Sequence, residues 1–352
     1  MKGCTNIFFV YLVVLFYPAI AQTEVKPEEK SLVKWLSFQE AFEQNKKQPK
    51  PFLIDVYTDW CGWCKHMMRT TYSDPSVSGY INNWFYPIKF NAETKDTIEY
   101  LGTKYFNEDT IRKRSTHQLA VKLLGTQQSY PSTIFINNNF QFVLNTSGFL
   151  ESKKIEPILV YTVENVFRTT AYEDFKKYFE KTFYDTVKTK SEPKWLSFSK
   201  ALELNKKKNK KMMVVIYTNW CNACRVMNKT TFSDSGLSEY INKNYYLVDF
   251  NAEIKDSILF NGTIFANNNS NGIPFHQLAM ALTQKNLILP SLIILDEKQQ
   301  VINALPYYTS PGNLEPVVKY FGDNSYKSTK WDDYLKKFKE PKEQKAPEKK
   351  KK

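Results

Sequence analysis

Two pairs of cysteines with the same spacing carry most of the chemistry that this sequence could perform. Cys61 and Cys64 form the first pair, and Cys221 and Cys224 form the second. Two intervening residues bring the thiols within disulfide reach when the second cysteine lies one helical turn after the first. A helix N-terminus also lowers the pKa of a thiol placed there. The pattern predicts dithiol redox chemistry.

Each pair follows an apolar run and a tryptophan, which indicates the elements that position the thiols. The run Phe52–Tyr57 is almost continuously apolar, as is Met213–Tyr217 in the second half. Such runs are typical of a central strand that is covered on both faces. We therefore expect a buried strand, a turn that holds the first cysteine, and a helix that begins at the pair.

An internal repeat sets the domain organisation. The two halves match at an offset of 160 residues, which becomes 159 after a one-residue deletion. The matching segments include Lys34–Phe38 with Lys194–Phe198, Thr70–Asp74 with Thr230–Asp234, and His117–Ala120 with His276–Ala279. The repeat predicts one domain over residues 31–183, a linker over 184–193 and a second domain over 194–340.

Hydrophobic periodicity predicts the same order of elements in each half. In the first half the expected helices are Phe38–Asn45, one that opens at the cysteine pair, Pro75–Ile81, Gln118–Leu124, Glu151–Phe167 and Tyr172–Phe183. The expected strands are Phe52–Tyr57, Tyr86–Phe90, Thr133–Asn137 and Phe142–Asn145. The polar stretch Glu93–Ser115 is long for a connection, so we expect some helix there or a mobile flap.

The two ends of the chain have distinct compositions. Residues 1–21 are interpreted as a signal peptide, because an apolar run precedes Ala19-Ile20-Ala21, a cleavage-like sequence. The run is shorter than the roughly 20 residues that a spanning helix needs, although an uncut anchor is the alternative. Residues 341–352 are predicted to be a lysine-rich disordered tail. These features predict a secreted protein without a stable membrane span.

The net charge of +13 comes partly from lysine clusters that we interpret as solvated loops and a tail. Attraction to an anionic surface or to acidic substrates is the alternative. Nucleic-acid binding fits poorly with a signal peptide.

A strand, a Trp-Cys-x-x-Cys turn that enters a helix, and a proline just before a later strand resemble the thioredoxin superfamily over nearly all of both halves. The resemblance implies two tandem α/β folds, each a central mixed β-sheet flanked by helices, with an extra C-terminal helix. It makes Cys61 and Cys221 the attacking thiols, and Cys64 and Cys224 the resolving thiols. The Trp-Cys-Gly-Trp-Cys-Lys form resembles secreted proteins of this family, which implies a thiol:disulfide oxidoreductase of the bacterial periplasm or cell envelope.

The resemblance also implies a substrate groove beside each pair, where a cis-proline presents the preceding backbone to an extended peptide. Tryptophans at the rim are expected mainly to pack there, with substrate contact as a second role. The residues expected at the two grooves are Trp60, Tyr130 and Pro131, then Trp220, Leu289 and Pro290.

Asp55 lies six residues before Cys61, inside the apolar strand. A buried carboxylate has a raised pKa and could accept a proton from Cys64, which is the role that the resemblance implies. Val215 occupies the matching position in the second half, so we expect the first pair to exchange faster. The repeated His117 and His276 are predicted to have structural hydrogen-bonding roles.

Other readings of the cysteines stay open at this point. Four cysteines could bind zinc, but 157 residues separate Cys64 from Cys221 and each pair belongs to its own repeat. We therefore expect no metal and no cofactor beyond the redox-active disulfides. The expected partners are protein or peptide thiols and disulfides, with an unidentified thiol donor or acceptor. The lack of histidine within either pair favours a reductase or isomerase.

A peptide-binding or chaperone-like module that keeps the fold with little redox turnover is a second class of function. Two inert structural disulfides are a third.

Overall fold

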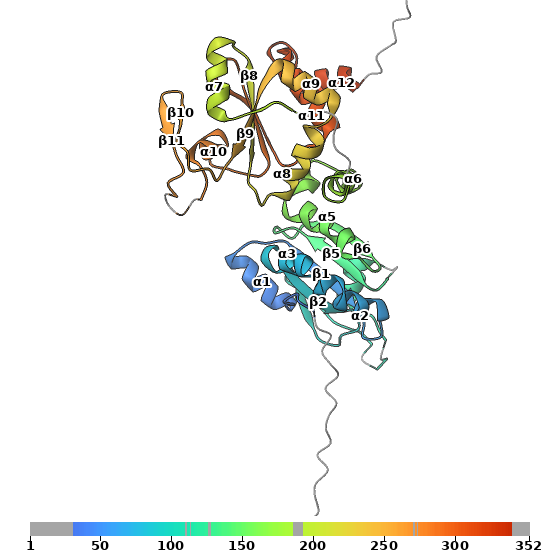
Figure 1. Ribbon diagram of the computed structural model, residues 1–352. Helices are drawn as coiled ribbons and strands as arrows, with labels where there is room; N and C mark the ends of the chain where they lie inside the picture. The colour runs from blue at the N-terminus through green and yellow to red at the C-terminus, as the bar shows by residue number, and fades with distance from the viewer. Residues whose placement is uncertain are drawn as a thin grey trace, which may run out of the picture.

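The computed structural model describes residues 31–339, except 110, 113, 126–127, 186–192, 270–271 and 273, and forms two sheet-and-helix regions (Figure 1). We call residues 31–183 the first region and residues 194–339 the second region. The predicted signal peptide at 1–21 and tail at 341–352 lie outside the described residues, as does most of the predicted linker.

The first region is built on a mixed four-stranded sheet in the order β2-β1-β5-β6. The central strand β1 runs parallel to β2 and antiparallel to β5, so its apolar residues are covered on both faces, as the sequence predicts. The strands are β1 Phe52–Tyr57, β2 Tyr86–Asn91, β5 Ser132–Ile136 and β6 Phe142–Ser147.

The α-helices described in the first region are α1 Phe38–Lys47, α2 Gly62–Arg69, α3 Pro75–Trp84, α4 Gln118–Leu124, α5 Ser152–Val163 and α6 Tyr172–Phe183. Local signals set several of their ends. Ser37 and Glu40 form a reciprocal capping box at α1, and Asp74 caps α3 with Pro75 in its first turn. The predicted helix Glu151–Phe167 ends early at Val163, because Asn165 adopts a left-handed conformation with φ of 54°.

The polar stretch Glu93–Ser115 contains a β-hairpin in place of the helix that was expected as one of two alternatives. Its strands are β3 Ile98–Tyr100 and β4 Thr103–Tyr105, and Gly102 has a φ of 77° at the turn between them. Tyr100 is buried against Phe38 and Phe42, and this contact anchors the hairpin. The strands are too short to show a period-two pattern in the sequence.

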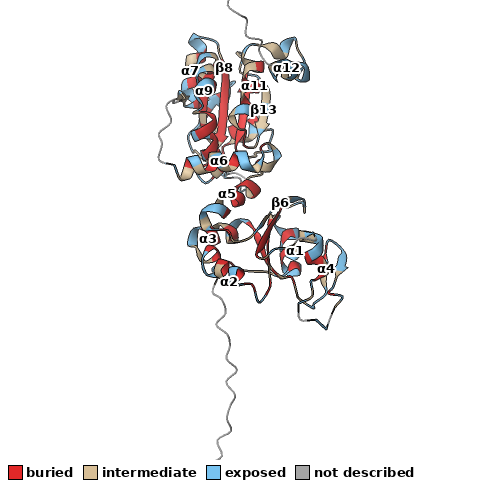
Figure 2. Cartoon of the chain, turned by 90° about the vertical axis from the view of Figure 1, so that its right-hand side faces the viewer, coloured by how far each residue is buried: buried red, intermediate tan, exposed pale blue. Residues whose placement is uncertain are grey.

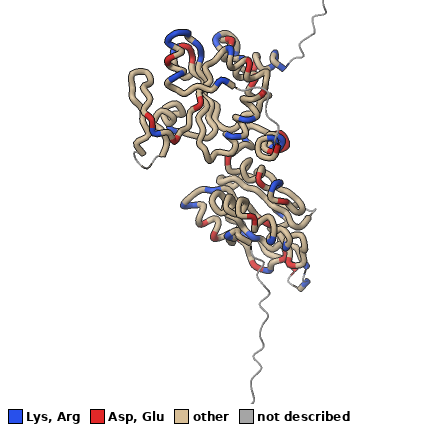
Figure 3. Tube along the Cα trace, in the orientation of Figure 1, with Lys and Arg blue, Asp and Glu red and all other residues tan. Residues whose placement is uncertain are grey.

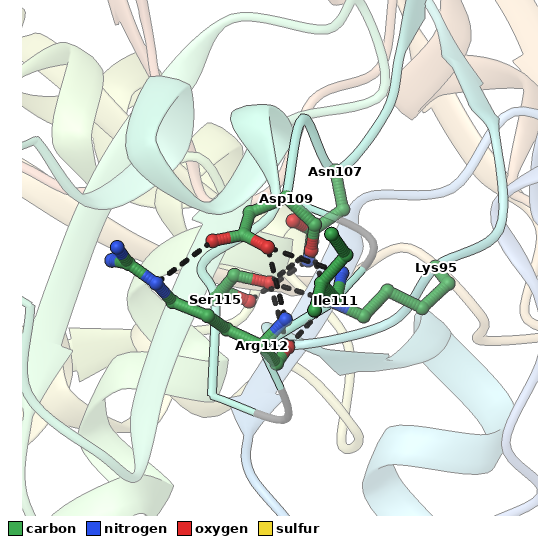
Figure 4. Close-up of polar contacts among 6 residues, drawn as sticks. All are labelled: Lys95, Asn107, Asp109, Ile111, Arg112 and Ser115. Carbon is green, nitrogen blue, oxygen red and sulfur yellow. Dashed lines mark hydrogen bonds and ion pairs between the residues drawn. The ribbon is translucent and has the colours of Figure 1, made fainter.

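The loop that follows the hairpin is held by one lysine (Figure 4). Lys95 Nζ donates to the carbonyl oxygens of Asp109 at 2.6 Å and Arg112 at 3.0 Å, and also to Ser115 Oγ. Asn107 Nδ2 closes the loop by donating to the carbonyl of Ser115 at 2.8 Å. These bonds fix a loop that reaches the first cysteine pair, as shown below.

The second region repeats the order of elements on a five-stranded sheet, β13-β12-β8-β9-β7. Its sheet strands are β7 Trp195–Leu196, β8 Lys211–Tyr217, β9 Tyr245–Asn251, β12 Ser291–Leu295 and β13 Val301–Pro306, and its hairpin strands are β10 Ile258–Phe260 and β11 Thr263–Phe265. Its helices are α7 Phe198–Lys207, α8 Asn222–Val226, α9 Ser235–Asn244, α10 Gln277–Leu282, α11 Pro311–Gly322 and α12 Trp331–Lys339. A π-helical segment, Met227–Thr231, continues α8.

Helix α6 of the first region packs into the core of the second region. Phe175 is fully buried and meets Tyr308 edge-to-face at 5.2 Å, within one hydrophobic cluster that also holds Phe179 and second-region residues. Asn313 Nδ2 donates to the carbonyl of Thr169 at 3.0 Å. Figure 2 shows buried residues along α5 where the two regions meet. The junction is therefore apolar, which disfavours free motion between the regions.

Charged side chains are spread over both regions, with acidic and basic groups interspersed (Figure 3). Several lysines pair with a neighbour on their own helix, such as Lys46 with Glu43 and Lys200 with Glu203, and both partners are exposed. Such pairs contribute little to stability. Within the described residues, no helix is both long and apolar enough to cross a bilayer.

Candidate redox sites

The first cysteine pair forms a disulfide at the start of α2, with its Cα atoms 5.3 Å apart. Cys61 is the N-cap residue, and its Sγ lies 3.0 Å from the backbone N–H of Cys64. Both cysteines are largely buried, but the two residues between them are exposed, and 62% of Trp63 is accessible. The sulfur of Cys61 therefore lies at a helix N-terminus under a surface that is open to solvent.

Three predicted groove residues come together beside this disulfide. Trp60 is half exposed and meets Tyr130 edge-to-face at 6.2 Å, and the bond between Tyr130 and Pro131 is cis. Trp60 Nε1 donates to Glu93 Oε1 at 2.9 Å, while the Arg114 guanidinium lies 5.2 Å from the Trp60 ring. The loop held by Lys95 thus supplies a cation at the rim, which the sequence did not indicate.

Asp55 is buried in the middle of β1, as the sequence predicts. Tyr72 OH donates to Asp55 Oδ1 at 3.2 Å and lies 3.4 Å from Thr133 Oγ1. Asp55 Oδ2 has no hydrogen-bond partner among the described residues. Burial raises the pKa of Asp55 to about 7, and the Tyr72 hydroxyl and the charge of Lys89 oppose the shift. A carboxyl of this kind changes its protonation near neutral pH.

In the second region, apolar side chains take the place of Asp55, Tyr72 and Thr133. Val215, Phe232 and Leu292 stand where the first region has Asp55, Tyr72 and Thr133, and all three are buried in one core cluster. The missing acid was predicted from Val215. The matching losses of the Tyr72 hydroxyl and of Thr133 become evident only when the structure shows that the three residues touch.

The second cysteine pair has the same internal geometry, but the first region covers it. Cys221 and Cys224 form a disulfide at the start of α8, again with Cα atoms 5.3 Å apart. Glu164, at the end of α5, accepts from the backbone N–H groups of Asn222 at 3.0 Å and Ala223 at 2.6 Å. Its Oε2 lies 3.4 Å from Cys221 Sγ. The two residues between these cysteines are therefore shielded, in contrast to those of the first pair.

The first region also contacts the rim of the second pair. Trp220 stacks on Trp84 of the first region at 6.0 Å, and its Nε1 donates to Glu253 Oε1 at 3.0 Å. The bond between Leu289 and Pro290 is cis, and Leu289 packs against the core. The tryptophan of the second site thus contacts another part of this chain, whereas Trp60 contacts only its own region in the bonds and ring contacts described above.

His117 and His276 are fully buried N-cap residues, which supports the structural role that the sequence predicted. His117 Nδ1 accepts from the N–H of Leu119 at 3.1 Å, and its Nε2 lies 3.0 Å from the carbonyl oxygen of Asp96. The second bond ties α4 to the connection before the β3-β4 hairpin. Burial lowers the pKa of His117, so the ring is neutral near pH 7.

Replacing His117 with alanine is expected to lower the free energy of unfolding by about 2 to 3 kcal/mol, because a cap and a buried hydrogen bond are lost together. Asparagine at this position keeps a capping acceptor, so His117→Asn should lose less. Urea denaturation of both variants measures the difference. A loss of disulfide exchange in a folded His117→Ala protein would contradict the structural role.

Among the described residues, no group of three or more histidine, cysteine, aspartate or glutamate side chains could hold a metal ion. Within that part of the chain all four paired cysteines are engaged in disulfides.

Comparison with known families agrees with this geometry in both regions. A family model named Thioredox_DsbH, described as "Protein of unknown function, DUF255", matches residues 23–182. A second model, described as "Thioredoxin-like domain", matches residues 198–322. The chain belongs to the thioredoxin superfamily. The mixed sheets, the disulfide at a helix start and the cis-proline before β5 and β12 are thus features of two thioredoxin-like regions.

Individual relatives of this thioredoxin-like chain share only parts of it. A protein of Pectobacterium atrosepticum named "Thiol:disulfide interchange protein DsbD" is 42% identical over 36 residues, which are 10% of this chain and 6% of that protein. A thioredoxin-fold protein from Helicobacter pylori is 22% identical over 46% of this chain and 92% of its own, with a TM-score of 0.30. A thioredoxin from Thermus thermophilus is 15% identical over 37% of this chain and 88% of its own, with a TM-score of 0.29.

Proposed function

We propose that this protein is a thiol:disulfide oxidoreductase of the cell envelope and that its first dithiol, Cys61 and Cys64, carries out most of the disulfide exchange. The observation that carries the proposal is the first disulfide itself. It lies at a helix N-terminus, its intervening residues are exposed, and an open aromatic rim of Trp60 and Tyr130 adjoins it. The printed name of the Pectobacterium relative, a thiol:disulfide interchange protein, supports the reaction class.

The reaction exchanges one disulfide for another. The Cys61 thiolate attacks one sulfur of a substrate disulfide, so a bond forms between Cys61 and that sulfur while the substrate bond breaks. The other substrate sulfur leaves as a thiolate and takes up a proton. Cys64 then loses its proton and attacks Cys61 Sγ, which releases the first substrate sulfur as a thiol. The substrate gains two electrons and two protons, and the pair ends as the disulfide seen in the structure.

Asp55 is proposed to accept the proton that Cys64 loses in the second step, either directly or through water. Its support is the burial of the carboxyl and its pKa of about 7, which lets it hold a proton for part of the cycle at neutral pH. The second region has no counterpart on its own central strand. The first dithiol should therefore be the faster of the two.

The direction of exchange follows from the relative reduction potentials of the pair and its partner, and we propose the reductase or isomerase direction because neither pair encloses a histidine. The envelope location rests on the predicted signal peptide. Protein or peptide disulfides are the proposed substrates, since the rim beside the cis-proline leaves Trp60 half exposed.

Insulin reduction driven by dithiothreitol tests the proposal. The Cys61→Ser variant is expected to lose roughly two orders of magnitude in turnover, because no attacking sulfur remains at the open site. The Cys221→Ser variant should stay within about twofold of the unmodified protein, since most exchange passes through the first pair.

Two results would contradict this assignment. Equal losses in the two variants would mean that both sites work, and no turnover in the unmodified protein would favour a binding module. A variant without cysteines that still binds unfolded clients would support that second reading.

A further inference from the structure

Glu164 is the feature that separates the two disulfides most clearly, and its meaning depends on the proposed dithiol function. It belongs to the first region, yet its side chain makes its described contacts with the second cysteine motif and with Tyr80. Figure 1 places α5 and α6 beside α8, so the carboxylate comes from the helix that ends at the junction.

The carboxylate occupies two of the backbone N–H groups that would stabilise a thiolate at Cys221, while the N–H of Cys224 donates to Cys221 Sγ at 3.1 Å. A thiolate at a helix start is stabilised by the free N–H groups of the first turn. At α8 the N–H groups of Asn222 and Ala223 already donate to Glu164. A second anion, 3.4 Å from Glu164 Oε2, would be repelled as well.

The packing around Glu164 holds it in this position. Helix α6, which follows it in the chain, contacts α8 and the π-helical segment, and Phe175 on α6 is fully buried against Tyr308. The Arg225 guanidinium on α8 lies 5.0 Å from the ring of Phe183 at the end of α6. Withdrawal of Glu164 would therefore need the apolar junction to loosen.

We infer that Glu164 is a positioning residue that controls the second dithiol: it keeps Cys221 a protonated, weakly nucleophilic thiol until Glu164 itself is protonated or withdrawn. In the reduced state the Cys221 S–H can donate a hydrogen bond to the Glu164 carboxylate, whose Oε2 lies 3.4 Å from the sulfur. The chain would then contain one dithiol that is open to solvent and a second whose reactivity the first region restrains.

The electrostatics of the pair support this role near neutral pH. Burial raises the pKa of Glu164 to about 7, while the N–H groups of Ala223 and Asn222 and the Tyr80 hydroxyl oppose the shift. Tyr80 on α3 and Cys221 at α8 are the titratable groups that face it among the described residues. Glu164 and Cys221 should therefore titrate as a coupled pair in the reduced protein.

The chain contains a matched control for this residue. Asp323 stands at the equivalent position of the second region, at the end of α11. Its exposed carboxylate accepts from the N–H of Ser325 at 3.0 Å, so it bonds to the segment that directly follows it. Removing this charge leaves the surroundings of both disulfides intact.

The test measures the alkylation of Cys221 in the full chain. The background carries Cys4→Ser, Cys61→Ser and Cys64→Ser, so that only the second pair reacts, and peptide mass analysis identifies the modified cysteine. Reduced protein is mixed with iodoacetamide between pH 5 and pH 10. At pH 7, where about half of Glu164 is ionised, Glu164→Gln is expected to raise the rate about twofold. The rise should grow to severalfold near pH 8, because Glu164 is charged there and a close negative charge raises the thiol pKa by about one unit or more. Asp323→Asn should leave the whole profile unchanged.

The limiting rate at high pH separates charge from access. Fitting each profile to its fully ionised limit removes the difference in thiol pKa, so Glu164→Gln should match its parent within about twofold in this limit if the effect is electrostatic. An equal rise at all pH values would mean that the substitution only opens the junction, and an unchanged or slower rate near pH 8 would mean that Glu164 does not restrain Cys221. Either result overturns the inference.

A second variant keeps the test decisive if Glu164→Gln does not fold. Glu164→Asp retains the charge on a shorter side chain, and it should raise the rate near pH 8 by less than the glutamine. A rate equal to or below that of the parent would count against the inference. Alkylation needs no turnover, so the outcome is independent of insulin reduction by the first pair, which tests the proposed function separately.

Discussion

Replacing Asp55 with asparagine is expected to raise the free energy of unfolding at pH 8 by up to about 4 kcal/mol. The unfolded chain ionises Asp55 near its ordinary pKa of about 3.9, whereas the folded protein does so only near 7. Between these values the folded state holds the extra proton, so this residue makes stability fall as the pH rises from about 4 to about 7. Above that window the full cost of a buried carboxylate is present, and asparagine removes it.

Urea denaturation at pH 5 and at pH 8 measures this effect. The gain from Asp55→Asn should be much smaller at pH 5, because most of the cost has not yet developed there. Contributions from His117 and His276 are the same in both proteins and cancel in the difference. Asp59→Asn, which changes an exposed carboxylate in the next turn, serves as the control. Equal gains at both pH values would show that ionisation of Asp55 is not the cause.

Replacing Phe175 with alanine is expected to destabilise the second region by about 3 to 5 kcal/mol, because a fully buried ring leaves a cavity in its core. The same change should speed the reduction of the second disulfide by dithiothreitol, since α6 helps to hold Glu164 over it. Urea unfolding and the rate of thiol release measure the two effects.

Tyr334 on α12 is the matching residue of the repeat and gives the control. No residue of α12 is buried, so Tyr334→Ala should cost far less than Phe175→Ala and should leave the reduction rate unchanged. Similar losses in the two variants would mean that α6 is not part of the core of the second region.

Local signals in the sequence were sufficient for most elements of each region. The apolar run Phe52–Tyr57, the cap at Asp74 and the cysteine spacing each depend on neighbours in the chain, and the structure confirms the strand, the helix and the disulfide. The burial of Asp55 was predictable because a carboxylate inside a central strand has no route to solvent.

The remaining features depend on contacts between distant residues. The β3-β4 hairpin rests on Tyr100 packing against Phe38, which no local pattern shows. Glu164 was missed because its partners at the second cysteine pair lie in the other half of the chain, 58 residues away at Asn222. The sequence around Glu164 indicates only the end of a helix. Aligning the two repeats pairs equivalent positions, so it does not reveal a residue of one repeat that contacts the other.

The packing of α6 shows that the sequence repeat and the folded unit have different boundaries. By the repeat, α6 belongs to the first half, yet Phe175 and Phe179 complete the hydrophobic cluster of the second. A cut in the segment after α6 would therefore leave the second half with part of its interior missing and the first half with a helix whose apolar face has lost its cover. The two halves are therefore not independent copies, because the apolar face of α6 is covered only when both are present.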